Sequence, residues 1–239
     1  MMPAVEMQRD MTPFTELPEP SAVAKRINVT AMPWLAADDW ARIAPIEISH
    51  FHPAGTDHRP TTRVRIAHDG STIFLRYDVA DRYLLSRQTE DQKHVYKDSC
   101  VEFFIWPAAA VGYFNFEFNA GGTRFCHFIE DATRIPGGFV KHRPMAIDDI
   151  QRVQVRSSLP RVVEPEIESP TAWWFEATIP VSVLEPYVGT IGQLSGQAFR
   201  AGFFKCADES SHPHWGSWAP MGDELNFHQP NRFGTLRFE

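Results

Sequence analysis

Two runs of the chain, Asp98–Trp106 and Tyr113–Asn119, place acidic and amide side chains among aromatic residues. The second run alternates strictly, with Phe114, Phe116 and Phe118 at every second position. A period of two indicates a strand with one buried face. The other face then carries the polar side chains Tyr113, Asn115, Glu117 and Asn119. Amides and carboxylates form strong hydrogen bonds with vicinal hydroxyl groups, which is the chemistry of sugar recognition.

Glu102 adds a second carboxylate to this set. In the first run it shares a face with Phe104 and Trp106, opposite an apolar face made of Val101, Phe103 and Ile105. If the two runs are neighbouring strands, Glu102 lies close to Asn115 and Glu117. An ordinary solvated sheet face explains the same pattern about equally well.

The two glutamates also match the chemistry of a glycoside hydrolase. Such an enzyme flanks the scissile bond with two carboxyl groups about 5–10 Å apart, and neighbouring strands allow that distance for Glu102 and Glu117. A role in which both glutamates only accept hydrogen bonds from hydroxyl groups or arginine needs fewer coincidences than a catalytic role. The chain also lacks a G-x-S-x-G, Walker, H-E-x-x-H or C-x-x-C motif. We therefore assign no catalytic residue.

Two aromatic residues, Tyr96 and Phe227, stand beside polar residues in expected loops. Exposed aromatic rings pack on the apolar C–H faces of sugars, and both residues are candidates for that role. For either ring taken singly, a structural role is more common than sugar binding: the ring packs beneath its loop and covers the edge of the core.

Several histidines form close pairs, namely His50 with His52 and His212 with His214, and His228 follows Phe227. A pair at positions i and i+2 holds a metal ion only if a third ligand converges from elsewhere. With ten histidines in the chain, chance pairs are expected. The sequence therefore predicts no metal site from them.

The composition limits the class of protein and its partners. A chain of 239 residues with 43% hydrophobic residues is long enough for one large domain. The net charge of −7 argues against nucleic acid or an anionic membrane as a partner. Three widely spaced cysteines, Cys100, Cys126 and Cys206, are expected to be reduced core residues.

The N-terminal stretch carries acids and has no apolar segment of the secretory type. This favours a cytoplasmic protein, or a secreted or periplasmic one if a signal has been removed. Residues 1–24 are rich in proline and glutamate, so we expect an extended arm there and a single domain over 25–239.

Short strands separated by turn residues dominate the pattern, and a long amphipathic helix is missing. This indicates an all-β sandwich or barrel. Single helical turns are expected at Trp34–Trp40 and Val181–Leu184, and long loops at 131–148 and 207–232. The expected strands are Lys25–Thr30, Ile46–Phe51, Thr62–Ala67, Thr72–Val79, Asp98–Trp106, Tyr113–Asn119, Thr123–Ile129, Gln151–Ser158, Thr171–Ile179, Ala198–Cys206 and Gly234–Phe238.

Five segments in order resemble carbohydrate-binding module family 9 and together span about residues 25 to 239. They are the hairpin Thr62–Asp81, the run Tyr96–Ile105, the strand ending in Asn119, the run Trp174–Pro180 and the ending Phe227–Leu236. The resemblance implies an immunoglobulin-like antiparallel β-sandwich related to the DOMON group. It further implies a non-catalytic protein that holds a small saccharide or a chain end between two aromatic rings.

The resemblance also assigns roles to particular residues. The two rings fall on Tyr96 and Phe227, where the family has tryptophans, and the strand glutamate falls on Glu102. The polar positions of the next strand fall on Asn115, where the family has glutamine, and on Glu117, where it has arginine. Both ring platforms are therefore smaller and one charge is reversed, so the resemblance does not by itself imply the family's preference for reducing ends of plant polysaccharides.

The family relation leaves cofactors and alternatives open. Some members carry structural calcium, for which oxygen ligands could come from Asp69, Asp78 or Asp81, although the sequence contains no recognisable calcium loop. A haem-binding DOMON-type domain would need an axial pair such as Met145 with His127 or Met221 with His228. A saccharide is the expected ligand, and a glycoside hydrolase acting on the same saccharide is an expected partner.

Overall fold

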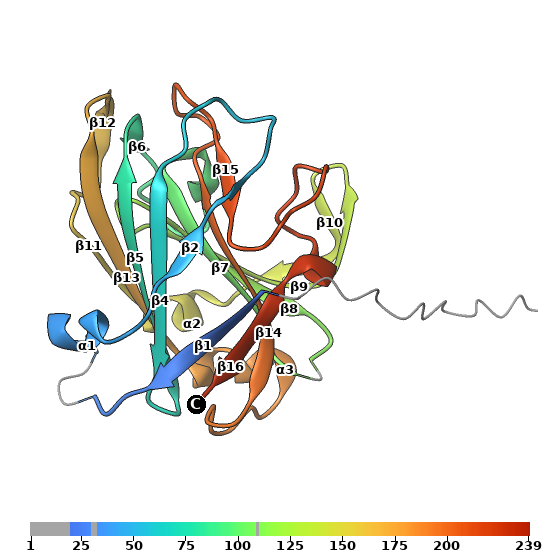
Figure 1. Ribbon diagram of the computed structural model, residues 1–239. Helices are drawn as coiled ribbons and strands as arrows, with labels where there is room; N and C mark the ends of the chain where they lie inside the picture. Colours follow the sequence, from blue (N-terminus) through green and yellow to red (C-terminus); the bar gives the residue numbers. More distant parts are fainter. Residues whose placement is uncertain (1–19, 30–32, 109) are drawn as a thin grey trace, which may run out of the picture.

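The computed structural model describes residues 20–29, 33–108 and 110–239. Two β-sheets pack face to face, as Figure 1 shows, and this confirms the expected all-β sandwich. The first sheet runs, in spatial order, through β10 (Gly138–Pro144), β9 (Arg124–Ile135), β8 (Tyr113–Asn119), β7 (Cys100–Trp106), β14 (Ala198–Cys206), β16 (Gly234–Phe238) and β1 (Ser21–Arg26).

The second sheet begins on the same strand β1, which leaves the first sheet after Ala24 and pairs with the other layer through Lys25 and Arg26. Both pairings of β1 are parallel, whereas the neighbouring pairs of both sheets are antiparallel. The sheet continues through β4 (Thr61–His68), β5 (Thr72–Asp81), β13 (Thr171–Pro180) and β11 (Gln154–Ser157), with β2 (Ile46–Ile48) also on β4.

Short elements close the ends of the sandwich. The short strands are β3 (His50–Phe51), which pairs with β15 (Trp215–Ser217), and β6 (Leu84–Ser86), which pairs with β12 (Val163–Ile167). The helices are α1 (Ala37–Ala41), α2 (Ile147–Arg152) and α3 (Glu185–Val188), with 3₁₀ turns η1 (Val95–Lys97), η2 (Val181–Val183) and η3 (Pro230–Arg232). Among the described residues, no helix has the length and apolar character needed to cross a membrane.

The core between the sheets is aromatic. Phe103 and Phe116 from the first sheet and Tyr77 and Phe175 from the second are fully buried in one cluster. Tyr77 also crosses the layers, because its hydroxyl donates to the backbone carbonyl of Glu102 at 2.7 Å. The inner faces of β7 and β8 therefore follow the expected alternation, and the polar face of each strand is turned to the outside of the sandwich.

Several expected elements need correction. The first strand begins at Ser21 instead of Lys25, so Ser21–Ala24 belong to the sandwich; residues 1–19 of the expected arm, and Thr30, lie outside the described residues. The expected strand Ile46–Phe51 is divided into β2 and β3. The loop expected over 207–232 contains β15 and η3, and the strands β6 and β12 were not predicted.

The loop expected over 131–148 is the largest error. Strand β9 continues to Ile135 and returns as β10 after a turn at Pro136 and Gly137; Gly137 and Gly138, the first residue of β10, both have positive φ. From Asp131 onward most of this hairpin is exposed, so its side chains show no alternation of apolar and polar residues. A pattern search depends on one buried face and therefore misses a hairpin that extends beyond the core.

Candidate functional site

A cleft lies on the outer face of the first sheet, over strands β7, β8, β9 and β14. Its volume of about 710 Å³ falls in the range of about 300–1,000 Å³ that small-molecule sites occupy. The β9–β10 hairpin and the loop before η3 form walls, and Figure 1 shows these two segments side by side. All five residues selected from the sequence line it, namely Tyr96, Glu102, Asn115, Glu117 and Phe227.

The floor of the cleft consists of the polar residues of β7 and β8. Glu102 and Glu117 are direct cross-strand partners, so the two strands are neighbours as expected. The Asn115 side chain donates to Glu117 Oε1 at 2.7 Å and accepts a hydrogen bond from the backbone N–H of His127 at 2.9 Å. These contacts fix the orientation of the amide and leave Glu117 Oε2 without a hydrogen-bond partner among the described residues.

Burial changes the protonation of these acids. Glu102 and Glu117 are only 2% and 4% exposed, and loss of water disfavours a charged carboxylate. Burial raises the pKa of Glu117 to about 8, and it raises the pKa of Glu102 well above its usual range with a further contribution from the anionic forms of Cys206 and Glu117. Burial also raises the pKa of Asp208, at the side of the cleft, to about 6. Glu102 and Glu117 on the floor are therefore mostly neutral at neutral pH, whereas Asp208 at the side is mostly ionised.

The polar face of these strands is thus not a solvated sheet face. Tyr113 and Asn119, which share the alternation, take part in structural contacts at either end of β8. The Tyr113 hydroxyl lies 2.9 Å from His228 Nδ1, and the Asn119 amide donates to the buried carboxylate of Asp98 at 2.8 Å. Only the middle of the strand, with Asn115 and Glu117, faces the cleft.

Tyr96 belongs to one wall and is placed by η1. Its ring stacks on His94 with 5.4 Å between the ring centroids, and its backbone carbonyl accepts a hydrogen bond from the N–H of Asp208 at 3.1 Å. Lys97 continues this link, because its carbonyl accepts from the N–H of Glu209 at 2.9 Å. The segment after β14 therefore holds the Tyr96 turn against the sheet.

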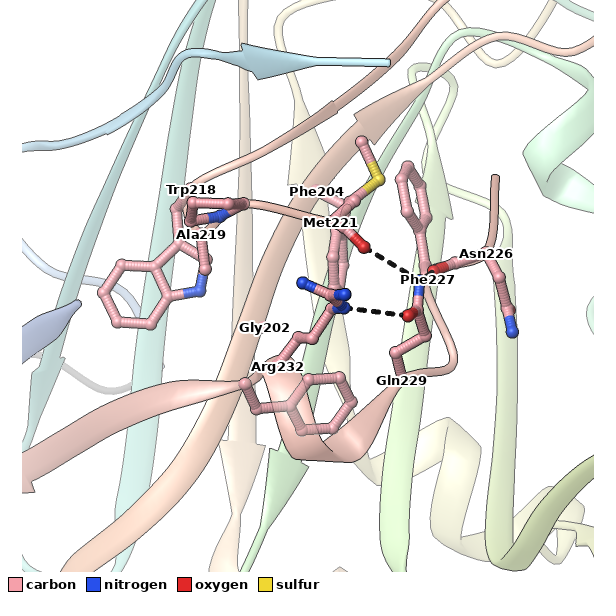
Figure 2. Close-up of a pocket in the computed structure, with 11 residues that line it drawn as sticks. Gly202, Phe204, Trp218, Ala219, Met221, Asn226, Phe227, Gln229 and Arg232 are labelled. Carbon is pink, nitrogen blue, oxygen red and sulfur yellow. Dashed lines mark hydrogen bonds between the residues drawn. The ribbon is translucent and has the colours of Figure 1, made fainter. Parts of the chain in front are cut away.

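Phe227 also lines the cleft and, like Tyr96, packs against the buried cluster of Val95, Cys100 and Cys206. One face of its ring stacks on Phe204 of β14, with centroids 4.3 Å apart and an angle of 17° between the planes. Figure 2 shows the loop that carries Phe227. Hydrogen bonds of the Gln229 side chain hold this loop together, because it donates to the carbonyl of Met221 at 3.1 Å and accepts from Arg232 at 3.0 Å. Phe227 lines both the small pocket drawn there, of about 10 Å³, and the cleft.

Sequence reasoning missed several lining residues. Phe125 and His127 on β9 are cross-strand partners of Glu117 and Asn115, and their rings stack with centroids 4.3 Å apart. The same two-residue alternation ran through this expected strand, so that signal was available. Three further lining residues, Arg134, Phe139 and His142, come from the hairpin that was expected to be a loop.

The calcium and haem alternatives find little support in side-chain positions. Asp69 accepts from the turn residues after it, Asp78 pairs with Arg65 and Arg76, and Asp81 pairs with Lys205 and His58. For haem, His127 and His228 line the cleft, whereas Met145 lies in the core between the sheets and Met221 lines the cavity of Figure 2. Neither methionine shares a cavity with its histidine.

The cysteines are free and buried, as expected. Cys100 and Cys206 are direct cross-strand partners on β7 and β14, and the thiol of Cys206 donates to Glu102 Oε1 at 3.2 Å. Cys126 lies on the other side of the sheet, in the core between the layers. Two of the three thiols thus belong to the floor of the cleft and its immediate support.

The family model of carbohydrate-binding family 9 matches residues 34–238. The chain belongs to this family, as its sequence motifs suggested. No curated protein matches it.

Similar solved structures share the fold. A proposed carbohydrate-binding protein from Bacteroides uniformis ATCC 8492 is 29% identical, with a TM-score of 0.81 over 92% of this chain and 100% of the other. A family 9 module from Caldicellulosiruptor kristjanssonii, solved in complex with glucose, is 13% identical with a TM-score of 0.57 over 92% and 96%. The module from that organism in complex with cellotriose is 14% identical with a TM-score of 0.59 over 92% and 94%.

Proposed function

We propose that this protein is a non-catalytic carbohydrate-binding protein that holds a small saccharide, or the end of a polysaccharide chain, in the cleft. The observation that carries the proposal is the floor of buried acids and an amide beside the rings Tyr96 and Phe227. Membership of carbohydrate-binding family 9 supports it, as do the related modules solved with glucose and cellotriose.

The protonation of the floor suits a neutral sugar. A neutral carboxyl group both donates a hydrogen bond through its O–H and accepts one through its carbonyl oxygen. Sugar hydroxyls have the same dual character, so Glu102 and Glu117 can each bind one without a buried charge. Asn115 is held by its two contacts and presents a fixed edge beside them. The floor therefore needs little rearrangement when it binds a ligand.

The aromatic residues would bind the apolar faces of the sugar. The Tyr96 and Phe227 rings are each partly buried, and each stacks on a neighbouring ring, His94 and Phe204 respectively. A ring already packed on one side loses little conformational entropy when a sugar ring covers the other side. This arrangement favours a mono- or disaccharide unit over an extended chain lying along a flat surface.

The hydrolase alternative fits the acids less well. A glycoside hydrolase keeps one carboxyl protonated and the other ionised. Here burial raises the pKa of both Glu102 and Glu117, so neither is kept as the ionised member at neutral pH. A separate glycoside hydrolase that acts on the same saccharide is the partner that this proposal favours.

Calorimetric titration with glucose, cellobiose, cellotriose, xylose and galactose tests the proposal. We expect at least one of these sugars to bind, and Tyr96→Ala to weaken that binding about tenfold, which is ~1.4 kcal/mol. Tyr83→Ala is the matched control, because Tyr83 is a partly buried tyrosine that stacks on His212 outside the cleft. Binding of no sugar, or equal losses in both variants, would contradict the proposal.

A further inference from the structure

One side of the cleft floor contains a group of metal-ligating atoms, of which the proposed sugar site uses only the carboxyl group of Glu102. Cys100, Glu102 and Cys206 offer two sulfur atoms and one carboxylate oxygen, all within 4.8 Å of one another. All three residues are buried, with exposed fractions of 0%, 2% and 1%. We call them the thiol–carboxyl cluster.

The two strands bring these atoms together for a simple geometric reason. Cys100 and Glu102 are two residues apart on β7, so their side chains leave the same face of the sheet. Cys206 is the direct partner of Cys100 on β14, and its side chain leaves that face as well. Cys206 already reaches Glu102, since its thiol donates to Oε1 at 3.2 Å.

Glu117 extends the cluster from the next strand. It is the direct partner of Glu102 on β8 and is 4% exposed. Its Oε2 atom is buried and has no hydrogen-bond partner in the part of the chain that the structure describes. An unpaired carboxyl oxygen in such a position carries a cost in free energy, and this cost is removed if a cation binds beside it.

The chemistry of the donor atoms points the same way. Cys100, Cys206, Glu102 and Glu117 are all acids, and each becomes an anionic ligand when it loses its proton. A dication bound among them would hold the thiols as thiolates, because metal-bound thiols are deprotonated.

We propose that the thiol–carboxyl cluster, with Glu117 from β8, is a binding site for a thiophilic divalent cation such as Zn²⁺. Two thiolates with carboxylate oxygens match the ligands that Zn²⁺ accepts, whereas Ca²⁺ and Mg²⁺ take oxygen ligands alone. Glu102, Glu117 and Cys206 line the cleft, which provides the path by which the ion enters.

The site would bind its ion by exchange with protons. Each thiol that becomes a ligand releases one proton, so binding of one Zn²⁺ to Cys100 and Cys206 releases up to two protons, and a protonated glutamate adds another. No bond is broken other than S–H and O–H, and no oxidant is needed. The inference goes beyond saccharide binding and does not depend on it, because the three ligating residues meet whether or not a sugar is present.

Titration with Co²⁺ tests the inference on the reduced, chelator-treated full-length protein without sugar. We expect one Co²⁺ per chain with a thiolate-to-metal charge-transfer absorption in the near ultraviolet, displaced by Zn²⁺. Cys126→Ser is the matched control, because Cys126 is buried on the inner face of the same sheet. It should keep the absorption, and Cys206→Ser should lose it.

Competition with a chromophoric chelator measures the affinity for Zn²⁺. Loss of a direct ligand in Glu102→Gln should weaken binding at least as much as the about 10–100-fold that second-shell changes cause. If Cys206→Ser fails to fold, the spectrum of the unmodified protein and the Zn²⁺ affinity of Glu102→Gln still test the proposed metal site. Absence of the charge-transfer band in the unmodified protein, or its persistence in Cys206→Ser, would overturn the inference. Sugar titration in the presence of a chelator keeps this outcome separate from that of the proposed function.

Discussion

Two buried polar clusters lie on opposite faces of the same strand, β14, and consecutive residues contribute to them. Cys206 faces the cleft, where burial and, after it, the neighbouring acids raise the pKa of Glu102. Lys205 is fully buried and faces the interior at one end of the sandwich. There its ammonium group lies 3.3 Å from the carboxylate of Asp81 and 2.8 Å from Nε2 of His214.

The interior group, which we call the ionic cluster, consists of Asp81, Lys205, His58 and His214. His58 contacts the second oxygen of Asp81 at 2.7 Å, and Nδ1 of His214 lies 2.9 Å from the carbonyl of His212. The nearby ammonium of Lys205 and the contact with His58 outweigh burial and hold the pKa of Asp81 well below its usual range. Burial lowers the pKa of His214 to about 3, so His214 stays neutral and accepts from Lys205.

The difference between the clusters indicates that one has a structural role and the other a role in ligand binding. His58, Asp81 and His214 also have the ligand atoms of a metal site. In the ionic cluster, however, the ammonium of Lys205 already occupies the place of a cation. The cleft floor holds acids that are neutral because they are buried, and one oxygen of Glu117 is unpaired. A compensated cluster stabilises the fold, whereas an uncompensated one is suited to a ligand.

Removal of the buried ammonium should have the largest effect. Lys205→Met leaves the Asp81 carboxylate buried without its charged partner, and such a change costs about 3–5 kcal/mol of unfolding free energy. Urea denaturation at neutral pH measures the loss. The double variant Lys205→Met/Asp81→Asn should recover part of it, because the unpaired charge is then removed. A loss below about 1 kcal/mol in the single variant would show that the ionic cluster is not structural.

The two clusters should respond to pH in opposite directions. The pKa of Asp81 is lowered from 3.8 and that of His214 from 6.5, so their stabilisation is present at neutral pH and declines on acidification below about 6.5. The pKa of Glu117 is raised from 4.5 to about 8, so its contribution is complete below 4.5 and is lost as pH rises towards 8.

The loss of stability as pH rises towards 8 reports on the acids of the cleft. Denaturation curves between pH 4 and about 8.5, recorded with a chelator, should show a slope from Glu117 of at most about 1.4 kcal/mol per pH unit. Glu117→Gln removes one titrating group and should make this decline shallower, leaving the part that the raised pKa of Glu102 contributes, while the acid limb stays unchanged. Identical pH profiles for the two proteins would mean that Glu117 titrates normally in the folded state.

Replacement of Glu102 by glutamine should have the smallest effect on stability. Glu102→Gln keeps the carbonyl oxygen that accepts from Cys206 and replaces a group that burial already keeps neutral. We expect the unfolding free energy at neutral pH to change by less than about 1 kcal/mol. A loss comparable with that of Lys205→Met would show that Glu102 is ionised in the folded protein, and the contrast between the clusters would fail.

The local pattern predicted the floor of the site well. Strand β8 has the bounds expected from the alternation in Tyr113–Asn119, and its pairing with β7 follows because the two runs are adjacent in sequence. The family motifs placed Tyr96 and Phe227 at the cleft as well. Their roles in sugar binding stay predictions until the titrations are made.

The period of two decided which side chains leave each face of a strand, because successive residues of an extended chain point in opposite directions. It determined that Glu102, Asn115 and Glu117 share one face. Only the tertiary structure decided that this face is covered, since the β9–β10 hairpin and the loop before η3 come from other parts of the chain. Burial by those segments turns ordinary carboxylates into neutral acids. The meeting of Cys206 with Cys100, and of Lys205 with Asp81, is likewise a long-range contact that no local pattern contains.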